Sequence, residues 1–174
     1  MNPRKVVPVI NDDGFVLGES RAILAYLINR YAPGHALYPT DAKKRAEIDR
    51  VLYLTAELFE RGKNVVKPVV YEGKWPIPEE PLKNYFELLK ALELLTAGKK
   101  FLAGDDLSIA DISFICDLTV LTGVLGVDIT ETAPGIAAWA ERMKEALPEY
   151  EELVGKAVVG FREMIEAKVG HKLE

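Results

Sequence analysis

The segment Leu107-Ser108-Ile109-Ala110-Asp111-Ile112 carries the strongest local signal in this chain of 174 residues. A serine followed three residues later by an acidic residue is a shorter form of the capping box, in which the acidic side chain reaches back to the serine amide. We therefore expect Ser108 to cap a helix, with Leu107 and Ile112 packing across its start. The residues that follow are almost entirely apolar, which predicts a helix over 109–124 inside a bundle.

Helical periodicity continues on both sides of this segment. Apolar residues spaced at i, i+3 and i+4 predict one helix over 19–32. A longer helix is expected from Thr40-Asp41 to about Tyr71, weakened or bent at Gly62 and Pro68 because glycine and proline disfavour helix interiors. Proline and glycine positions predict three further helices, over 81–97, 134–146 and 150–169.

Residues 1–18 follow a different pattern. Two short apolar runs, Val6–Ile10 and Phe15–Leu17, flank the turn-forming sequence Asn11-Asp12-Asp13-Gly14. Such a pattern predicts a β-hairpin. A lone hairpin is marginal in water, so we expect helices or further strands to cover it. The predicted fold class is therefore mostly α, with a small hairpin ahead of a helical domain.

The composition excludes several classes of protein. Apolar residues make up 49% and charged residues 28%, as in a folded globular domain. Acidic residues outnumber basic ones by 27 to 22, which argues against a nucleic-acid partner. The single cysteine, Cys116, and the widely separated His35 and His171 predict neither a disulfide framework nor a metal site. No apolar run suggests a membrane span or a signal peptide, so a cytoplasmic location and no membrane partner are expected.

The ordered set of motifs resembles a cytosolic glutathione S-transferase. Val7-Pro8-Val9 resembles the third strand of that family, with Pro8 at its cis-proline position, and Glu19-Ser20-Arg21 resembles its glutathione-anchoring helix start. Leu37-Tyr38-Pro39 is similar to the interdomain linker, and 101–111 to the capped buried helix. Residues 77–80 and 139–144 look most like the insect delta and epsilon classes, epsilon first.

This resemblance implies an architecture for the chain. It implies the second half of a thioredoxin-like domain, a hairpin plus a helix, at 1–34, and the all-helical C-terminal domain at 41–169. The β-α-β unit that carries the catalytic hydroxyl in the family is expected to be absent. No residue is therefore assigned a catalytic role, and the activity of the chain is expected to be impaired.

The resemblance also implies a glutathione site, with glutathione as co-substrate and no cofactor. The implied residues are Lys5, Val7, Pro8, Glu19, Ser20 and Arg21. A carboxylate at Glu19 suits the ligand ammonium group, and helix-start amides at Ser20 suit a carboxylate. The main chain of Val7 would pair with the cysteinyl part as a strand edge does. Alternatively, Glu19-Ser20 is only a helix cap.

A pocket for the electrophile is implied along the long helix. The implied residues are Phe59, Gly62, Val66, Val70 and Tyr71, of which three share one i, i+4 stripe. The alternative interpretation is that this stripe is bundle core. We expect the neighbouring Lys63 and Lys67 to be solvated, and Cys116 to be a small core residue.

Two functions follow as hypotheses. The first is conjugation of glutathione to small hydrophobic electrophiles, a detoxification activity, by a homodimer. The alternative is a noncatalytic dimerisation or protein-interaction scaffold, a use to which this family's helical domain is also put. A truncated form of an ordinary enzyme is a third possibility.

Overall fold

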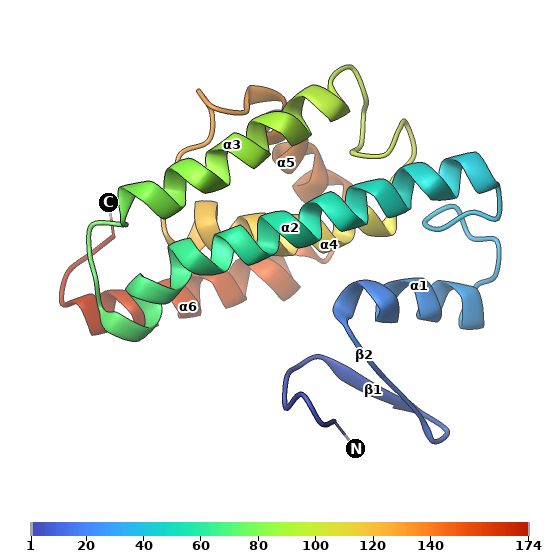
Figure 1. Ribbon diagram of the computed structural model, residues 1–174, viewed down its shortest axis with the longest axis horizontal. Helices are drawn as coiled ribbons and strands as arrows, with labels where there is room; N and C mark the ends of the chain where they lie inside the picture. Colours follow the sequence, from blue (N-terminus) through green and yellow to red (C-terminus); the bar gives the residue numbers. More distant parts are fainter. Residues whose placement is uncertain (1, 174) are drawn as a thin grey trace. The chain divides into compact units, whose positions relative to one another are not determined.

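The computed structural model describes residues 2–173, which form a hairpin followed by helices (Figure 1). The elements in chain order are β1 (Val9–Asp12), β2 (Phe15–Gly18), α1 (Ser20–Tyr31), α2 (Ala42–Glu72), α3 (Glu79–Thr96), α4 (Ile109–Thr119), the π-helical turn η1 (Val120–Val124), α5 (Pro134–Ala146), the π-helical turn η2 (Glu151–Gly155) and α6 (Lys156–Val169). The predicted mostly helical fold class is confirmed.

The chain divides into two compact units. The first unit contains the chain up to Tyr53 together with Lys99–Ser113, and the second contains Leu54–Gly98 together with the chain from Phe114 onward. The first unit therefore holds the hairpin, α1 and the start of α4, while the second holds most of the bundle. The domain ranges 1–34 and 41–169 stay a prediction.

The hairpin closes through a two-residue turn at Asp13 and Gly14. Both residues have left-handed backbone angles, with φ of 47° and 92°, and such turns match the twist of paired strands. The strands pair antiparallel from Val9 opposite Gly18 to Asp12 opposite Phe15. The predicted first strand is thus shifted: it starts after Pro8, which has no amide hydrogen to donate, and it extends to Asp12. The Val7–Pro8 peptide is cis, as the resemblance implied.

A carboxylate joins the hairpin to α1. The Tyr26 and Tyr31 hydroxyls donate hydrogen bonds of 2.5 and 2.6 Å to the two oxygens of Asp12. These hydrogen bonds, that of Tyr26 first, hold the pKa of Asp12 below its usual range. The ring of Phe15 lies 5.1 Å from that of Tyr26, so an aromatic contact accompanies the polar one.

The Asp12 contacts predict a pH dependence. Because folding lowers the pKa of Asp12, its ionised form stabilises the fold above the unfolded pKa of about 3.9, and this contribution is lost as the pH falls through the folded pKa. We expect wild type to be more stable than Asp12→Asn at pH 7, and the difference to shrink below about pH 4. Urea unfolding of both proteins across pH 2.5–7 measures this. A difference that is independent of pH would contradict it.

The start of α4 is organised by the fully buried carboxylate of Asp111. Its two oxygens accept hydrogen bonds from the Leu102 amide at 2.8 Å, the Ser108 amide at 2.9 Å and the Ser108 hydroxyl at 2.7 Å. The predicted reach of Asp111 back to the Ser108 amide is confirmed. Ser108 stands directly before α4, at the expected cap position, and its carbonyl accepts from the Ile112 amide at 3.3 Å.

The linker before α2 is hydrogen-bonded to the start of α4. The Ile109 amide donates to the Leu37 carbonyl at 3.0 Å. The next residue, Tyr38, is buried, and its hydroxyl donates to Asp49 at 2.8 Å. Burial, followed by this hydrogen bond, raises the pKa of Tyr38 to about 12. The loop before α4, the linker and the first turns of α2 are therefore connected through hydrogen bonds.

We expect removal of the Asp111 carboxylate to lower the free energy of unfolding. Asp111→Ala leaves two buried amides without their acceptor, at about 1–3 kcal/mol each, so the free energy of unfolding should fall by about 3–5 kcal/mol. Asp106→Ala is the control, since its carboxylate is exposed and pairs only with Lys44 at 3.3 Å. Urea denaturation gives both values. A loss below about 1 kcal/mol for Asp111→Ala would contradict the assigned role.

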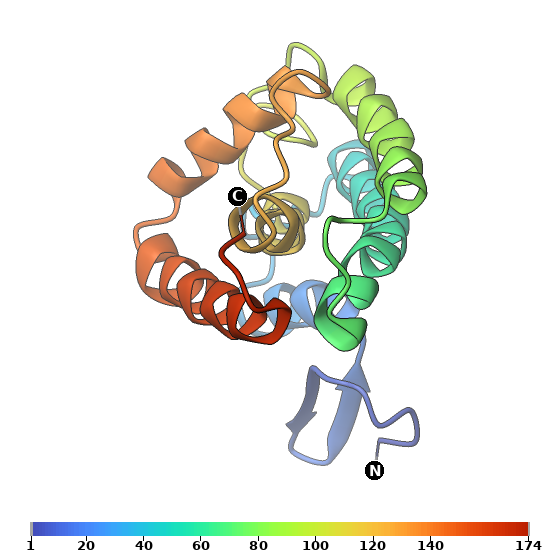
Figure 2. The ribbon, with the colours of Figure 1, turned by 90° about the vertical axis from the view of Figure 1, so that its left-hand side faces the viewer.

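The core of the second unit forms around the end of α4. Phe114 and Leu118 have no exposed surface, and this end of the helix lies in the middle of α2, α3, α5 and α6 (Figure 2). The ring of Phe114 stacks on that of Trp139 at 5.5 Å. From α2, Val65 and Val69 are equally buried. The predicted interior position of this helix is confirmed.

Two predicted helices contain π-helical turns that periodicity did not indicate. The expected helix over 109–124 changes to η1 at Val120, and the expected helix over 150–169 begins as η2. In the first case the Thr119 and Thr122 hydroxyls donate to the Ile115 and Leu118 carbonyls, at 2.6 and 3.2 Å. Hydroxyls that bond to carbonyls four residues back compete with the helix amides and loosen the turn.

The long helix α2 lies where it was expected, and the predicted weakening or bend at Gly62 and Pro68 stays a prediction. It runs without interruption past Gly62 and Pro68 and ends one turn later at Glu72. Pro68 lacks the amide that would donate to the Asn64 carbonyl in the preceding turn, and the Lys74 amide closes the end of the helix on the Pro68 carbonyl at 3.0 Å. Within residues 2–173, none of the helices is both long and apolar enough to cross a bilayer.

Candidate functional site

Glu19 stands in an unusual conformation directly before α1. Its φ of 68° and ψ of 105° lie in a region that residues with side chains rarely adopt, at a cost of about 1–3 kcal/mol. Its side chain makes no capping hydrogen bond and instead forms an ion pair with Arg4. Glu19 is therefore the N-cap residue of α1 through its carbonyl, which accepts from the Ile23 amide at 2.9 Å, but not through its side chain. Such strain is typical of residues held in place for binding a ligand.

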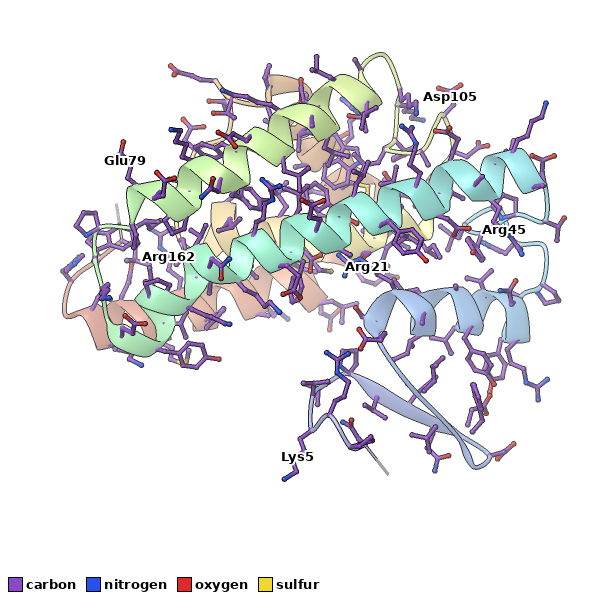
Figure 3. All side chains as sticks on the ribbon, in the orientation of Figure 1. Lys5, Arg21, Arg45, Glu79, Asp105 and Arg162 are labelled. Carbon is purple, nitrogen blue, oxygen red and sulfur yellow. The ribbon has the colours of Figure 1, made fainter. Side chains whose placement is uncertain are left out.

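The remaining residues of the implied glutathione site lie on the hairpin side and at the start of α1. Ser20 is the first residue of α1, and Arg21 is half-buried beside it. Val7 is 91% exposed, and among the residues described its main chain makes no hydrogen bond. Lys5 points away from the hairpin (Figure 3). Arg4, which the sequence analysis did not single out, is the cation paired with Glu19.

This arrangement offers complementary groups to a peptide-like ligand. The exposed Glu19 carboxylate can bind an ammonium group by exchange with Arg4. The first amides of α1, which have no partner within the helix, can donate to a carboxylate at the positive end of the helix dipole. The exposed main chain at Val7 can pair with an extended backbone.

A cavity of about 180 Å³ lies in the second unit among α2, α3, α4 and η1. Four of the five residues implied for the electrophile pocket line it: Phe59, Gly62, Val66 and Tyr71. Val70 does not. Phe59 and Tyr71 are 42% and 73% exposed, so this stripe borders an open cavity, whereas the buried face of α2 carries the neighbouring Leu58, Val65 and Val69.

Tyr85 and Asp117 complete the wall of this cavity and were not found from the sequence. Tyr85 is 2% exposed, and burial, followed by the negative charge of Asp117, raises the pKa of its hydroxyl. It therefore remains a neutral phenol. A tyrosine within the apolar stripe of the helix predicted over 81–97 was the signal that could have indicated it.

Lysine side chains also reach the rim of the cavity. Lys63 pairs with Glu60 at 2.5 Å, and its ammonium lies 5.3 Å from the centre of the Phe59 ring. Lys67, which is exposed, lines the rim as well. Lys67 is exposed as expected, Lys63 is half-buried, and both lysines line a cavity whose wall also holds Asp117.

The expected core position of Cys116 is wrong. Its side chain is exposed, because Phe114, Ile115 and Leu118 occupy the inward face of this helix. The surrounding protein atoms, and then the charge of Asp117, raise the pKa of the Cys116 thiol. The thiol is therefore accessible but has little thiolate at neutral pH.

Comparison with known proteins identifies the family. Residues 22–146 match the model of the glutathione S-transferase C-terminal domain, and residues 1–35 match that of the N-terminal domain. The chain belongs to the glutathione S-transferase family. The hairpin lies in the part matched by the N-terminal domain, most of α1 lies where the two matches overlap, and α2 to α5 lie in the part matched by the helical C-terminal domain.

Three proteins that the chain resembles come from insects. The chain is 30% identical over 146 residues to glutathione S-transferase 1 of Manduca sexta, covering 83% of this chain and 67% of that protein. The structure of a delta-class transferase of Nilaparvata lugens matches with a TM-score of 0.87 and 33% identity, over 96% of this chain and 78% of that one. An epsilon-class transferase of the housefly Musca domestica matches with a TM-score of 0.83 and 32% identity, over 96% and 77%.

Gly62 offers a direct test of the cavity. A Cβ added there would meet the Tyr85 ring at 3.6 Å and Leu121 at 3.7 Å, so alanine fits without a clash but narrows the space. We expect Gly62→Ala to stabilise the helix by about 0.5–1 kcal/mol and to weaken binding of 1,3-dinitrobenzene, measured by equilibrium dialysis.

Gly160→Ala is the matched control for this substitution. Gly160 is also helical, and a Cβ there would meet nothing within 4 Å. It should give similar stabilisation in urea denaturation and leave dinitrobenzene binding unchanged. Equal binding by both variants would show that the probe does not occupy this cavity.

Proposed function

We propose that this chain binds glutathione through Glu19, the start of α1 and the main chain at Val7, and holds a small hydrophobic electrophile in the cavity beside Gly62. The observation that carries the proposal is the strained main chain of Glu19, whose carboxylate is paired with Arg4 at an exposed helix start. A purely structural helix start has no need of this conformation. The proposed reaction is conjugation, a detoxification activity.

The chemistry proposed is substitution at carbon. The glutathione thiolate forms a sulfur–carbon bond, the halide of the electrophile leaves with its electron pair, and the thiol proton passes to solvent. Thiolate formation is favoured by a hydrogen-bond donor placed at the sulfur. We assign no residue of this chain to that role, so we propose that the chain by itself accelerates the reaction weakly, through binding and orientation.

The finer assignments are proposals of the same kind. We propose an epsilon-like member of the insect delta/epsilon group, on the basis of residues 77–80 and 139–144. We also propose a cytosolic homodimer that associates along α2 and α3. Exposed Leu94 and Leu95 on α3 are consistent with a covered face.

Retention on immobilised glutathione tests the binding site. We expect wild type to be retained and to elute with free glutathione. Glu19→Gln, which keeps the size of the side chain but removes the charge, should lower the affinity about tenfold, the cost of losing one charge-assisted contact. Glu163→Gln, on the exposed side of α6, is the control and should bind as wild type does.

Turnover of 1-chloro-2,4-dinitrobenzene separates the enzyme from a scaffold. Retention on the resin with slow turnover is the expected result. Turnover comparable to that of the insect relatives would contradict the proposed weak acceleration. Failure of wild type to bind glutathione, in a protein that is folded and dimeric, would instead favour the noncatalytic interaction scaffold.

A further inference from the structure

A second cavity lies in the second unit, and no part of the proposed conjugation uses it. It has a volume of about 390 Å³ and opens among the end of α4, η1, α5, η2 and the start of α6. It shares no lining residue with the cavity beside Gly62. Its volume falls within the range of about 300–1,000 Å³ that is typical of small-molecule sites.

The wall of this cavity is mainly apolar, and small residues make the space. Ala137 and Ala140 face it from α5, one turn apart, and Gly123 and Gly155 face it from the two π-helical turns. Larger aliphatic residues such as Ile129 and Val158 complete the wall. An apolar body the size of one aromatic ring would therefore fit against this wall.

The buried hydroxyls that line the cavity already donate hydrogen bonds to other groups of the protein. Thr119 donates its single proton to the Ile115 carbonyl at 2.6 Å. In its 3.0 Å contact with the Tyr150 hydroxyl, Thr119 must then be the acceptor and Tyr150 the donor. Thr119 and Tyr150 are 7% and 8% exposed. The phenol oxygen of Tyr150 keeps a lone pair that can accept a hydrogen bond.

The remaining hydroxyls of the wall are committed in the same way. Thr122 donates to the Leu118 carbonyl at 3.2 Å, and Thr130 donates to Asp128 at 2.7 Å. The hydroxyls that line this cavity can therefore only accept a hydrogen bond from a ligand. Among the residues described, Lys144 is the one lining side chain that could still donate. Its ammonium pairs with Glu141 at 2.7 Å.

The net charge at the rim of the cavity also favours a ligand that donates hydrogen bonds, in particular a cation. Asp128, Glu141 and Glu151 contribute three negative charges and Lys144 one positive charge, which leaves two in excess. Hydrogen bonds from the Thr130 amide and hydroxyl lower the pKa of Asp128 and keep it ionised. A cavity with an apolar wall, acceptor oxygens and a negative rim complements an apolar molecule that carries a protonated amine.

We propose that this cavity is a binding site for hydrophobic primary or secondary amines. The apolar body lies against Ala137, Ala140 and Val158, and the ammonium group faces the carboxylates of the rim. The site is independent of the glutathione site and of the proposed conjugation.

The test uses three isosteric probes on the full chain. These are 2-phenylethylamine, 2-phenylethanol and phenylacetate, which are cationic, neutral and anionic at pH 7. Their binding is measured by titration in ¹⁵N-resolved NMR. We expect the amine to bind with shifts at the Gly123 and Ala137 amides, the alcohol to bind several-fold more weakly, and the carboxylate not to bind.

Three variants locate the site. Ala140→Leu fills the cavity and should abolish amine binding. Glu151→Gln removes one rim charge at an exposed position and should weaken binding roughly two- to fivefold, as expected for one exposed charge contact. Glu163→Gln makes the same change of net charge away from the cavity and should have no effect.

Several outcomes would overturn the proposal. Equal affinity for the three probes would refute the amine preference. Amine binding that survives Ala140→Leu, or shifts confined to residues around Gly62, would refute the location. An equal effect of Glu151→Gln and Glu163→Gln would reduce the binding to nonspecific attraction. If Ala140→Leu does not fold, the comparison of Glu151→Gln with Glu163→Gln still tests whether the amine binds at this cavity.

Discussion

One buried carboxylate, that of Asp111, fixes how the chain enters its central helix. It accepts from the Leu102 and Ser108 amides and from the Ser108 hydroxyl, while the adjacent Ile109 amide bonds to the linker at Leu37. The same helix then supplies Phe114 and Leu118 to the core of the bundle. A buried polar group without a hydrogen-bond partner is costly. The Asp111 carboxylate and the groups that donate to it therefore depend on one another. The apolar helix can be buried only because its polar start is fully satisfied.

Much of this fold could be predicted because its signals are local. The capping sequence around Asp111, the turn at Asp13-Gly14 and the proline at the start of α5 each act over a few residues, and all three were found where expected. The π-helical turns were not predicted. At η1 the Thr119 and Thr122 hydroxyls bond to main-chain carbonyls, and apolar periodicity does not carry that information. The shift of the first strand has a similar origin in main-chain pairing.

The candidate sites were predictable only in part, for a related reason. Residues on a single element, such as Phe59, Gly62 and Val66 on α2, were found by spacing and by resemblance. Partners that come from other elements were missed. Tyr85 and Asp117 reach the same cavity from α3 and α4, and Arg4 meets Glu19 across fifteen residues of chain. The misplacement of Cys116 shows the limit of hydrophobicity alone, since a helix that is apolar on all sides still has one side that is not covered.

The exposure of Cys116 sets a stoichiometric limit on the chain's own chemistry. With one thiol per chain, an electrophile can alkylate the sulfur of the protein once and no further, and the raised pKa of that thiol makes this event slow near neutral pH. Transfer to a small thiol, in contrast, continues for as long as substrate remains. Product in excess of one equivalent per chain therefore distinguishes turnover from self-modification. The same thiol provides a single attachment point for a reporter group next to Asp117 in the wall of the cavity beside Gly62.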